Sequence, residues 1–125
     1  MSFPEDIEIM VDVDYIDEES NSQKEKNAFA YTMTIVNMGD ETVCLTGRRW
    51  LITHGNGRIE EVAGSGVVGQ QPKIRPGEAF EYTSGSIIDG DVGAMTGHYD
   101  FITDGGTQFS AEIPRFILSA PRVLH

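Results

Sequence analysis

Cysteine, basic residues and long apolar runs are all scarce in this chain of 125 residues. The single cysteine, Cys44, excludes an internal disulfide and any site that needs two thiolates, and it agrees with a reducing compartment. No run approaches the ~18 to 20 apolar residues that cross a bilayer. The acidic start MSFPEDIEI is unlike a secretory signal, which begins with basic and then apolar residues. We therefore expect a soluble, cytoplasmic protein without membrane insertion.

Basic residues are outnumbered by acidic ones, nine Lys and Arg against twenty Asp and Glu, which gives a formal charge of -11. Such a charge repels nucleic acid and anionic membrane, so we expect neither as a partner. Between positions 48 and 75, however, five basic residues stand with only Glu60 and Glu61 as acids, a local charge of +3. The five are Arg48, Arg49, Arg58, Lys73 and Arg75. This contrast would steer a complementary partner.

Period-two alternation dominates the apolar pattern, and no window of about 12 or more residues repeats with the 3.6-residue period of a helix. Residues 7–15 and 28–35 alternate as half-buried strands do. The segment 17–27 between them is polar and has no apolar period, so we expect a solvated, mobile loop there.

The middle of the chain has the pattern of a bent hairpin. Residues 43–53 form an apolar strand pattern whose phase slips at Gly47, which predicts a bulge or a bend. His54-Gly55-Asn56-Gly57 is typical of a tight turn, and a short strand at 58–62 should pair back. Residues 75–78 predict another turn, before a strand that begins near Phe80.

The remaining pattern adds strands at 95–101 and 109–113, with Pro114 indicating a strand edge or a bulge. About seven or more strands without a crossover helix predict a single domain, 1–125, folded as an antiparallel immunoglobulin or fibronectin type III-like β-sandwich. A partly closed barrel is the alternative. Tyr99 is a candidate for the corner tyrosine that ties down a crossover between sheets. We expect residues 1–6 to be flexible.

Gly64-Ser65-Gly66-Val67-Val68-Gly69 has the spacing of a dinucleotide-binding loop. Such a loop follows a buried strand and opens a helix whose N-terminus binds the pyrophosphate. Here the preceding segment is polar, and Pro72 and Pro76 oppose a helix, where an interior proline costs about 3 kcal/mol. We interpret the segment as an inter-strand loop, and a nest of backbone amides that binds an anion is the alternative. That anion site would use Gly64, Ser65, Gly66 and Gly69, with charge from Lys73, Arg75, Arg48, Arg49 and Arg58.

Other chemistry has little support in the sequence. Cys44 lies in an apolar strand, no Gly-x-Ser-x-Gly motif occurs, and His54 and His98 lack a second ligand at zinc spacing. Asp12 and Asp14 share a strand face and would form at most a weak cation site, against the plainer interpretation of a solvated face. We expect no enzyme activity and no cofactor.

Several strings, in order from about Ile7 to the C-terminus, resemble the bacterial ApaG family. They are FAYTMTIVNMG, GRRWLITHGNGR, EVAGSGVVGQQPKIRPGEAFEYTSGSII, MTGHYDFI and FSAEIPRFIL. The resemblance implies a fibronectin type III-like β-sandwich, a link to cobalt resistance and magnesium efflux, and a gene near that of a diadenosine tetraphosphate hydrolase. Similar domains in an F-box protein and in a DNA polymerase delta-interacting protein imply a protein-interaction module. The family brings no catalytic residues, and its glycines imply only a suspicion of pyrophosphate binding.

Two functional hypotheses follow. The first is a non-enzymatic interaction module for an unidentified protein partner, with Trp50, His54 and Asn56 on a partner-facing turn beside the basic window at 48–75. The second is a binder of phosphate, pyrophosphate or a dinucleoside polyphosphate at Gly64 to Gly69. Exposed strand edges would also allow a weak homodimer.

Overall fold

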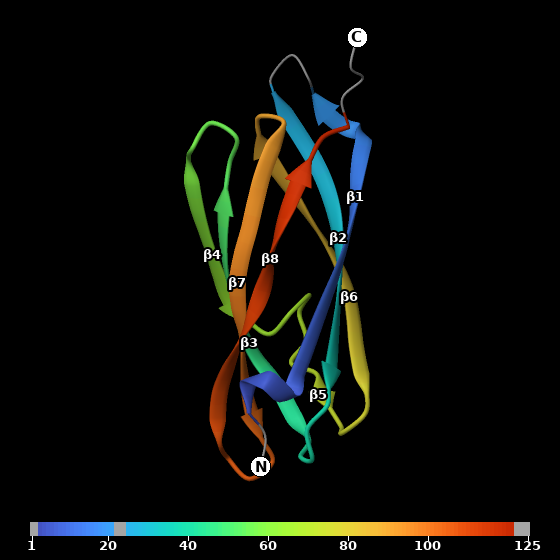
Figure 1. Cartoon of the computed structure of the whole chain (residues 1–125), viewed down its shortest axis with the longest axis vertical. Coiled ribbons are helices and arrows are strands. Elements are labelled where there is room, and N and C mark those ends of the chain that lie inside the picture. Colours follow the sequence, from blue (N-terminus) through green and yellow to red (C-terminus); the bar gives the residue numbers. More distant parts are fainter. Residues whose placement is uncertain (1–2, 22–24, 122–125) are drawn as a thin grey trace.

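Two antiparallel β-sheets pack face to face in the computed structural model, which describes residues 3–21 and 25–121 (Figure 1). The elements are η1 (Pro4–Asp6), β1 (Ile7–Asn21), β2 (Lys26–Asn37), β3 (Val43–Thr53), β4 (Ile59–Ser65), β5 (Lys73–Ile74), β6 (Ala79–Asp89), β7 (Val92–Thr103) and β8 (Gln108–Ser119). One sheet has the order β1-β2-β6, and the other has the order β4-β3-β7-β8 with β5 paired to β3. The predicted sandwich is confirmed, and no ladder between described strands closes it into a barrel. Within the same residues, no helix is long and apolar enough to cross a membrane.

The β1–β2 pair is longer than the sequence predicts. Asp17–Asn21 continues β1 and Lys26–Asn27 begins β2, so the expected solvated loop at 17–27 is wrong for these residues; positions 22–24 lie outside the described residues. The ladder continues past a bulge after Ile16 because Ser20 Oγ accepts a hydrogen bond from the Ala28 amide at 3.0 Å. A side-chain oxygen therefore replaces a backbone partner.

The chain start contains a short helical element. Residues 4–6, expected to be flexible, form the short 3-10 helix η1, which lies against β8. Residues 1–2 lie outside the described residues. Contact with β8 gives this segment an anchor that no sequence pattern indicates.

The predicted irregularities in the larger sheet are confirmed. The register of β3 against β7 shifts between Leu45 and Gly47, where the apolar phase slips. The turn after β3 leads into β4, which pairs back along β3 as predicted but extends to Ser65. Pro114 lies on the edge strand β8, where the register against β7 shifts again. Proline is tolerated there because an edge residue need not donate to a ladder.

The core is built around Trp50, whose side chain is only 2% exposed. Its indole contacts the rings of Tyr31 on β2, Tyr99 on β7 and Phe116 on β8, with centroid separations of 5.6, 6.2 and 5.9 Å. The rings meet at steep angles, the edge-to-face arrangement that aromatic quadrupoles favour. Because Tyr31 belongs to the smaller sheet and the other rings to the larger sheet, this cluster joins the two layers.

Tyr99 ties the sheets together, although not as a corner tyrosine. It lies in the middle of β7, fully buried, and its hydroxyl is 2.6 Å from the hydroxyl of Tyr82 on β6. The partner is therefore a side chain of the opposite sheet rather than the backbone of a crossover. Burial raises the pKa of Tyr82 to about 12 and raises the pKa of Tyr99 as well. Both hydroxyls stay protonated at neutral pH, and one donates a hydrogen bond to the other.

The two long sides of the sandwich differ. On one side β1 lies against β8. On the other side β6 and β4 are the edge strands of their sheets, and no comparable contact between these two described strands closes the gap. The sandwich is therefore open along the β4–β6 side.

The tyrosine pair should behave as a unit in a double-mutant cycle. Tyr82→Phe leaves the fully buried Tyr99 hydroxyl without a partner and should lower the free energy of unfolding by ~1–3 kcal/mol. Tyr99→Phe should lower it by less, because Tyr82 retains slight exposure to solvent. The double variant should lose less than the sum of the two, as measured by urea unfolding. Simple additivity would show that the hydroxyls do not interact.

Candidate functional site

The glycine-rich segment ends a strand and forms a tight turn. Gly64 and Ser65 belong to β4, and Val67 and Gln70 then exchange backbone hydrogen bonds of 2.8 and 2.9 Å. The residues between them, Val68 and Gly69, have φ values of 44° and 78°, as a two-residue hairpin turn with positive φ at both positions requires. No helix follows within the described residues, which excludes a dinucleotide-binding loop there. The loop interpretation is confirmed for Gly66 to Gly69 and wrong for Gly64 and Ser65, which belong to β4.

Hydrogen bonds within the protein occupy several amides of this segment. Gly66 donates to the carbonyl of Thr46 at 2.8 Å, and the amides of Val67 and Gln70 donate across the turn. A Cβ on Gly66 would lie 2.0 Å from the Gln70 carbonyl oxygen, so the close approach of two backbone segments explains this glycine. The amides at the tip, Val68 and Gly69, have no such acceptor among the described residues.

Three of the five basic residues of the window are engaged within the fold. Arg48 donates to the carbonyls of Ser65 and Gly66, at 3.2 and 3.0 Å, and so holds the glycine segment against β3. Arg49 pairs with Glu61 across β3 and β4, with a nitrogen–oxygen distance of 2.5 Å. Arg58 pairs with Asp89 at 2.9 Å. Carboxylates therefore compensate the charges of Arg49 and Arg58, whereas Arg48 is held by neutral carbonyl groups.

Lys73 and Arg75 are exposed and make no side-chain ion pair with the part of the chain that the structure describes. They lie on and just after β5, at the lower end of the molecule in Figure 1, whereas the β3–β4 turn that carries Arg58 is at the upper end. The five residues therefore do not form one patch. Basic residues that are close in the sequence, such as Arg58 and Arg75, therefore lie at opposite ends of the sandwich.

The predicted partner-facing turn is corrected by burial. Trp50 lies in the core, and His54 is only 3% exposed, because its ring points inward beneath the turn. Asn56 is exposed, but its side-chain oxygen accepts the Arg58 amide at 3.0 Å and stabilises the turn. Of the three, only Asn56 presents a side chain to solvent. Histidine in a turn motif is compatible with either position, so the sequence carries no signal for this burial.

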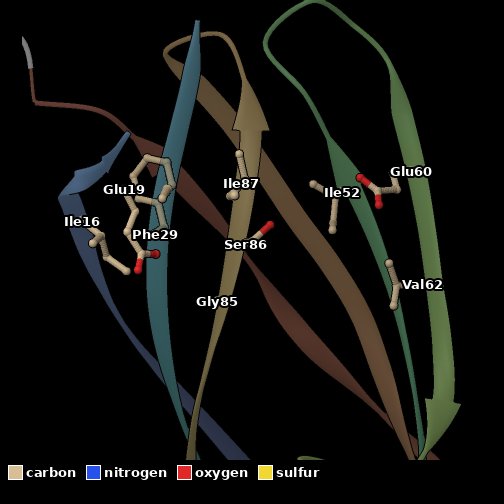
Figure 2. A pocket seen from close by; sticks show the side chains of 10 residues that line it. Ile16, Glu19, Phe29, Ile52, Glu60, Val62, Gly85, Ser86 and Ile87 are labelled. Carbon is tan, nitrogen blue, oxygen red and sulfur yellow. The ribbon is translucent and has the colours of Figure 1, made fainter. Parts of the chain in front are cut away.

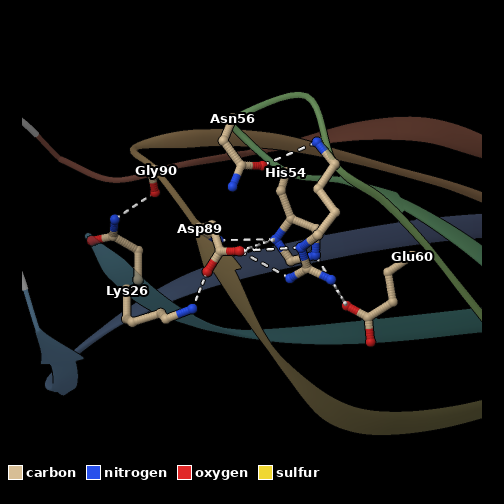
Figure 3. A network of polar contacts seen from close by, with 8 residues as sticks. Lys26, His54, Asn56, Glu60, Asp89 and Gly90 are labelled. Atoms are coloured by element: carbon tan, nitrogen blue, oxygen red, sulfur yellow. Dashed lines mark hydrogen bonds and ion pairs between the residues drawn. The ribbon is translucent and has the colours of Figure 1, made fainter. Parts of the chain in front are cut away.

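A polar network joins that turn to the end of β6 (Figure 3). His54 Nδ1 accepts the Asp89 amide at 2.9 Å, so Nε2 carries the proton and donates to Glu60 at 3.0 Å. The Gly55 amide donates to the Asp89 carbonyl at 2.7 Å, and the Asp89 carboxylate pairs with Arg58 and Lys26. The network connects both sheets and accounts for a buried histidine without assigning it a catalytic role.

Asp12 and Asp14, the candidate cation ligands, and Cys44 lie outside any cluster suited to a metal ion among the described residues. Asp12 and Asp14 lie on the exposed face of β1, opposite Thr32 and Ala30 of β2. No group of three or more His, Cys, Asp or Glu side chains suited to a metal ion occurs within residues 3–21 and 25–121. The half-buried Cys44 thiol donates to the Gln71 carbonyl at 3.5 Å.

One hollow on the surface was not indicated by the sequence. It is a groove of about 500 Å³ on the open side of the sandwich, between β6 and the β3–β4 hairpin (Figure 2). Its lining comprises Ile16, Glu19, Ala28, Phe29, Ile52, Glu60, Val62, Gly85, Ser86 and Ile87. Because five strands contribute, no local motif could have revealed it. The lining that the described residues provide is mainly apolar, with two carboxylates and no cation.

The Asp89 network should appear in the pH dependence of stability. Hydrogen bonds from Lys26 and Arg58 lower the pKa of Asp89 to about 2, so its contribution is complete above the unfolded pKa near 3.8 and is lost as the pH falls toward 2. The wild-type protein should therefore lose more stability than Asp89→Asn between pH 5 and pH 2, measured as the shift in melting temperature. Parallel curves for the two proteins would contradict this role.

Comparison with known proteins agrees with the resemblance found in the sequence. Residues 17–103 match the ApaG domain family. The chain is 49% identical over 120 residues to Protein ApaG of Nitrosomonas eutropha, and the match covers 96% of this chain and 94% of the relative. It is 51% identical over 117 residues to Protein ApaG of Escherichia coli O1:K1, and that match covers 94% of each. The X-ray structure of a Northeast Structural Genomics Consortium target superposes with a TM-score of 0.92 at 40% identity, covering 99% of this chain and 94% of that one. The chain belongs to the ApaG family.

Proposed function

We propose that the protein is a non-enzymatic interaction module that binds another protein. The observation that carries this proposal is the open, mainly apolar groove between β4 and β6, which offers contact surface but no reactive pair. Apolar surface of this kind on a soluble domain commonly marks a binding site.

The nearest approach to a catalytic cluster lies elsewhere, on the outer face of the larger sheet. Ser110 donates to Asp100 at 2.6 Å, and His98 lies 3.5 Å from the same carboxylate. The acid thus stands between the other two residues, whereas a nucleophilic serine needs the histidine beside it. This order supports a surface hydrogen-bond cluster rather than a hydrolytic site.

We place the module in divalent-cation homeostasis, the setting of cobalt resistance and magnesium efflux that the family resemblance implies. Asp12 and Asp14 lie on an exposed strand face, and the residues directly opposite them on β2 are Thr32 and Ala30 rather than further carboxylates. This arrangement supports an indirect route through a partner. Selective Mg²⁺ or Co²⁺ sites hold the ion with several convergent ligands. The partner, in this proposal, carries the cation chemistry.

Lys73 and Arg75 are proposed as a second contact for that partner, because they are exposed cations on an acidic protein and make no ion pair with the described residues. In a pull-down from bacterial lysate, Lys73→Glu and Arg75→Glu should each weaken capture by about 2- to 5-fold, mostly through slower association. Arg115→Glu on β8 changes the net charge equally and serves as the matched control. Equal loss in all three variants would indicate a general charge effect and contradict a local contact.

Binding of a phosphate, pyrophosphate or dinucleoside polyphosphate at Gly64 to Gly69 is the second candidate. It is favoured by the free amides at Val68 and Gly69 and by the cation Lys73 a few residues on. The engaged amides of Gly66, Val67 and Gln70 limit it to the tip of the turn.

Titration with inorganic pyrophosphate, followed by amide NMR, tests this candidate. Saturable shifts are expected at Val68 and Gly69, and Lys73→Gln should weaken them because it removes a charge. Inorganic sulfate at equal ionic strength is the control for nonspecific screening. Shifts that sulfate reproduces, or no shifts in residues 64 to 75, would end the candidate.

A further inference from the structure

The β6 edge has the features of a strand that accepts another strand. It runs for 11 residues, Ala79–Asp89, pairs with β2 in unbroken register and contains no proline and no lysine. Proteins usually protect free edges with proline, lysine, bulges or a covering element. The other edges have such protection: β8 carries Pro114 and a register shift, β1 lies against β8, and β4 is short and carries the charged Glu60 and Glu61.

The hydrogen-bond pattern shows which backbone groups of β6 face outward. Asp89 uses its amide and carbonyl to bind His54 and Gly55, away from β2. The Ala28 amide, opposite Ile87, points toward Ser20 of β1. Backbone amides and carbonyls point to alternate sides along a strand. The amides and carbonyls of Ile87, Gly85 and Thr83 therefore also point away from β2. No backbone partner occupies them among the described residues.

Apolar side chains flank this edge on both faces of the sheet. On the outer face, Ile16, Ala28 and Ile87 lie side by side in register, and Ile87 is 56% exposed. On the inner face, Ile52 and Val62 point into the groove toward β6 (Figure 2). An added strand places alternate side chains on opposite faces, so both sets would find apolar neighbours.

Charge selects the occupant. Glu19 and Glu60 line the groove on its two sides, and among residues 3–21 and 25–121 no lysine or arginine lines it. A second copy of this chain would bring the same carboxylates and another charge of -11 to the edge, which is repulsive. A basic segment would be attracted.

We propose that β6 binds an extended segment of a partner protein by strand addition, and that this segment alternates apolar residues with lysine or arginine. The inference rests on the proposed function as an interaction module and names the chemistry of its partner. Backbone hydrogen bonds to Thr83, Gly85 and Ile87 supply the affinity, while the flanking apolar surfaces and Glu19 and Glu60 supply the selectivity.

Selection from a displayed library of random short peptides against the intact protein tests the inference. The enriched peptides should alternate apolar and basic residues and should shift the amide signals of Thr83, Gly85 and Ile87. Enrichment of acidic or non-alternating peptides, shifts confined to another surface, or no enrichment would each overturn it.

Gly85→Pro is the decisive variant, because it removes an outward amide without breaking the β2–β6 ladder. Affinity for the enriched peptide should fall about tenfold. Gly85→Ala is the matched control: it keeps the amide, its Cβ would meet only the Phe29 carbonyl oxygen at 3.5 Å, and it should bind normally. Equal binding by both variants would overturn strand addition.

Two further variants separate the remaining outcomes. Glu19→Lys should weaken binding of the basic peptide and leave the melting temperature of the protein unchanged. If Gly85→Pro fails to fold, Ile87→Lys gives a second test of binding at the β6 edge. A lysate partner that Gly85→Pro still captures would overturn the β6 site while leaving the interaction module standing. Absence of any captured partner would instead overturn the proposed function.

Discussion

The packing of aromatic rings around Trp50 is the interaction on which the rest of the structure depends. Trp50 on β3 contacts Tyr31 on β2, so a single buried side chain sets the spacing between the two sheets. Burying several rings of this size contributes a large share of the favourable free energy available to so small a domain. The Tyr82–Tyr99 hydroxyl pair then satisfies the only polar atoms of those two rings.

Closure of the sandwich is uneven, and this unevenness creates the surface available for binding. β1 covers β8 along one side, whereas the other side is held mainly at its upper end, where His54 and Asp89 join the two sheets. Below this contact between His54 and Asp89, the groove stays open between β6 and the β3–β4 hairpin. The buried His54, which joins the β3–β4 turn to the end of β6, thus fixes one end of this strand edge.

Local patterns predicted the strands because side-chain alternation reflects burial directly. The phase slip at Gly47 predicted a real register shift, and Pro72 and Pro76 correctly excluded a nucleotide-binding helix. Prediction failed where a side chain's partner is distant in sequence. His54 and Trp50 sit in a motif typical of an exposed hairpin turn, but their burial depends on β6, β7 and β8.

The amino-acid sequence by itself determined the all-β class, most strand positions, the loop character of the glycine segment and membership of the ApaG family. The tertiary structure decided which charges remain unpaired and which strand edge remains free. Arg49 and Arg58 look equivalent to Lys73 and Arg75 in the sequence, yet within the described parts of the chain only the first two acquire carboxylate partners. Such pairing depends on which strands become neighbours, and that order arises only when the two sheets pack around their common core.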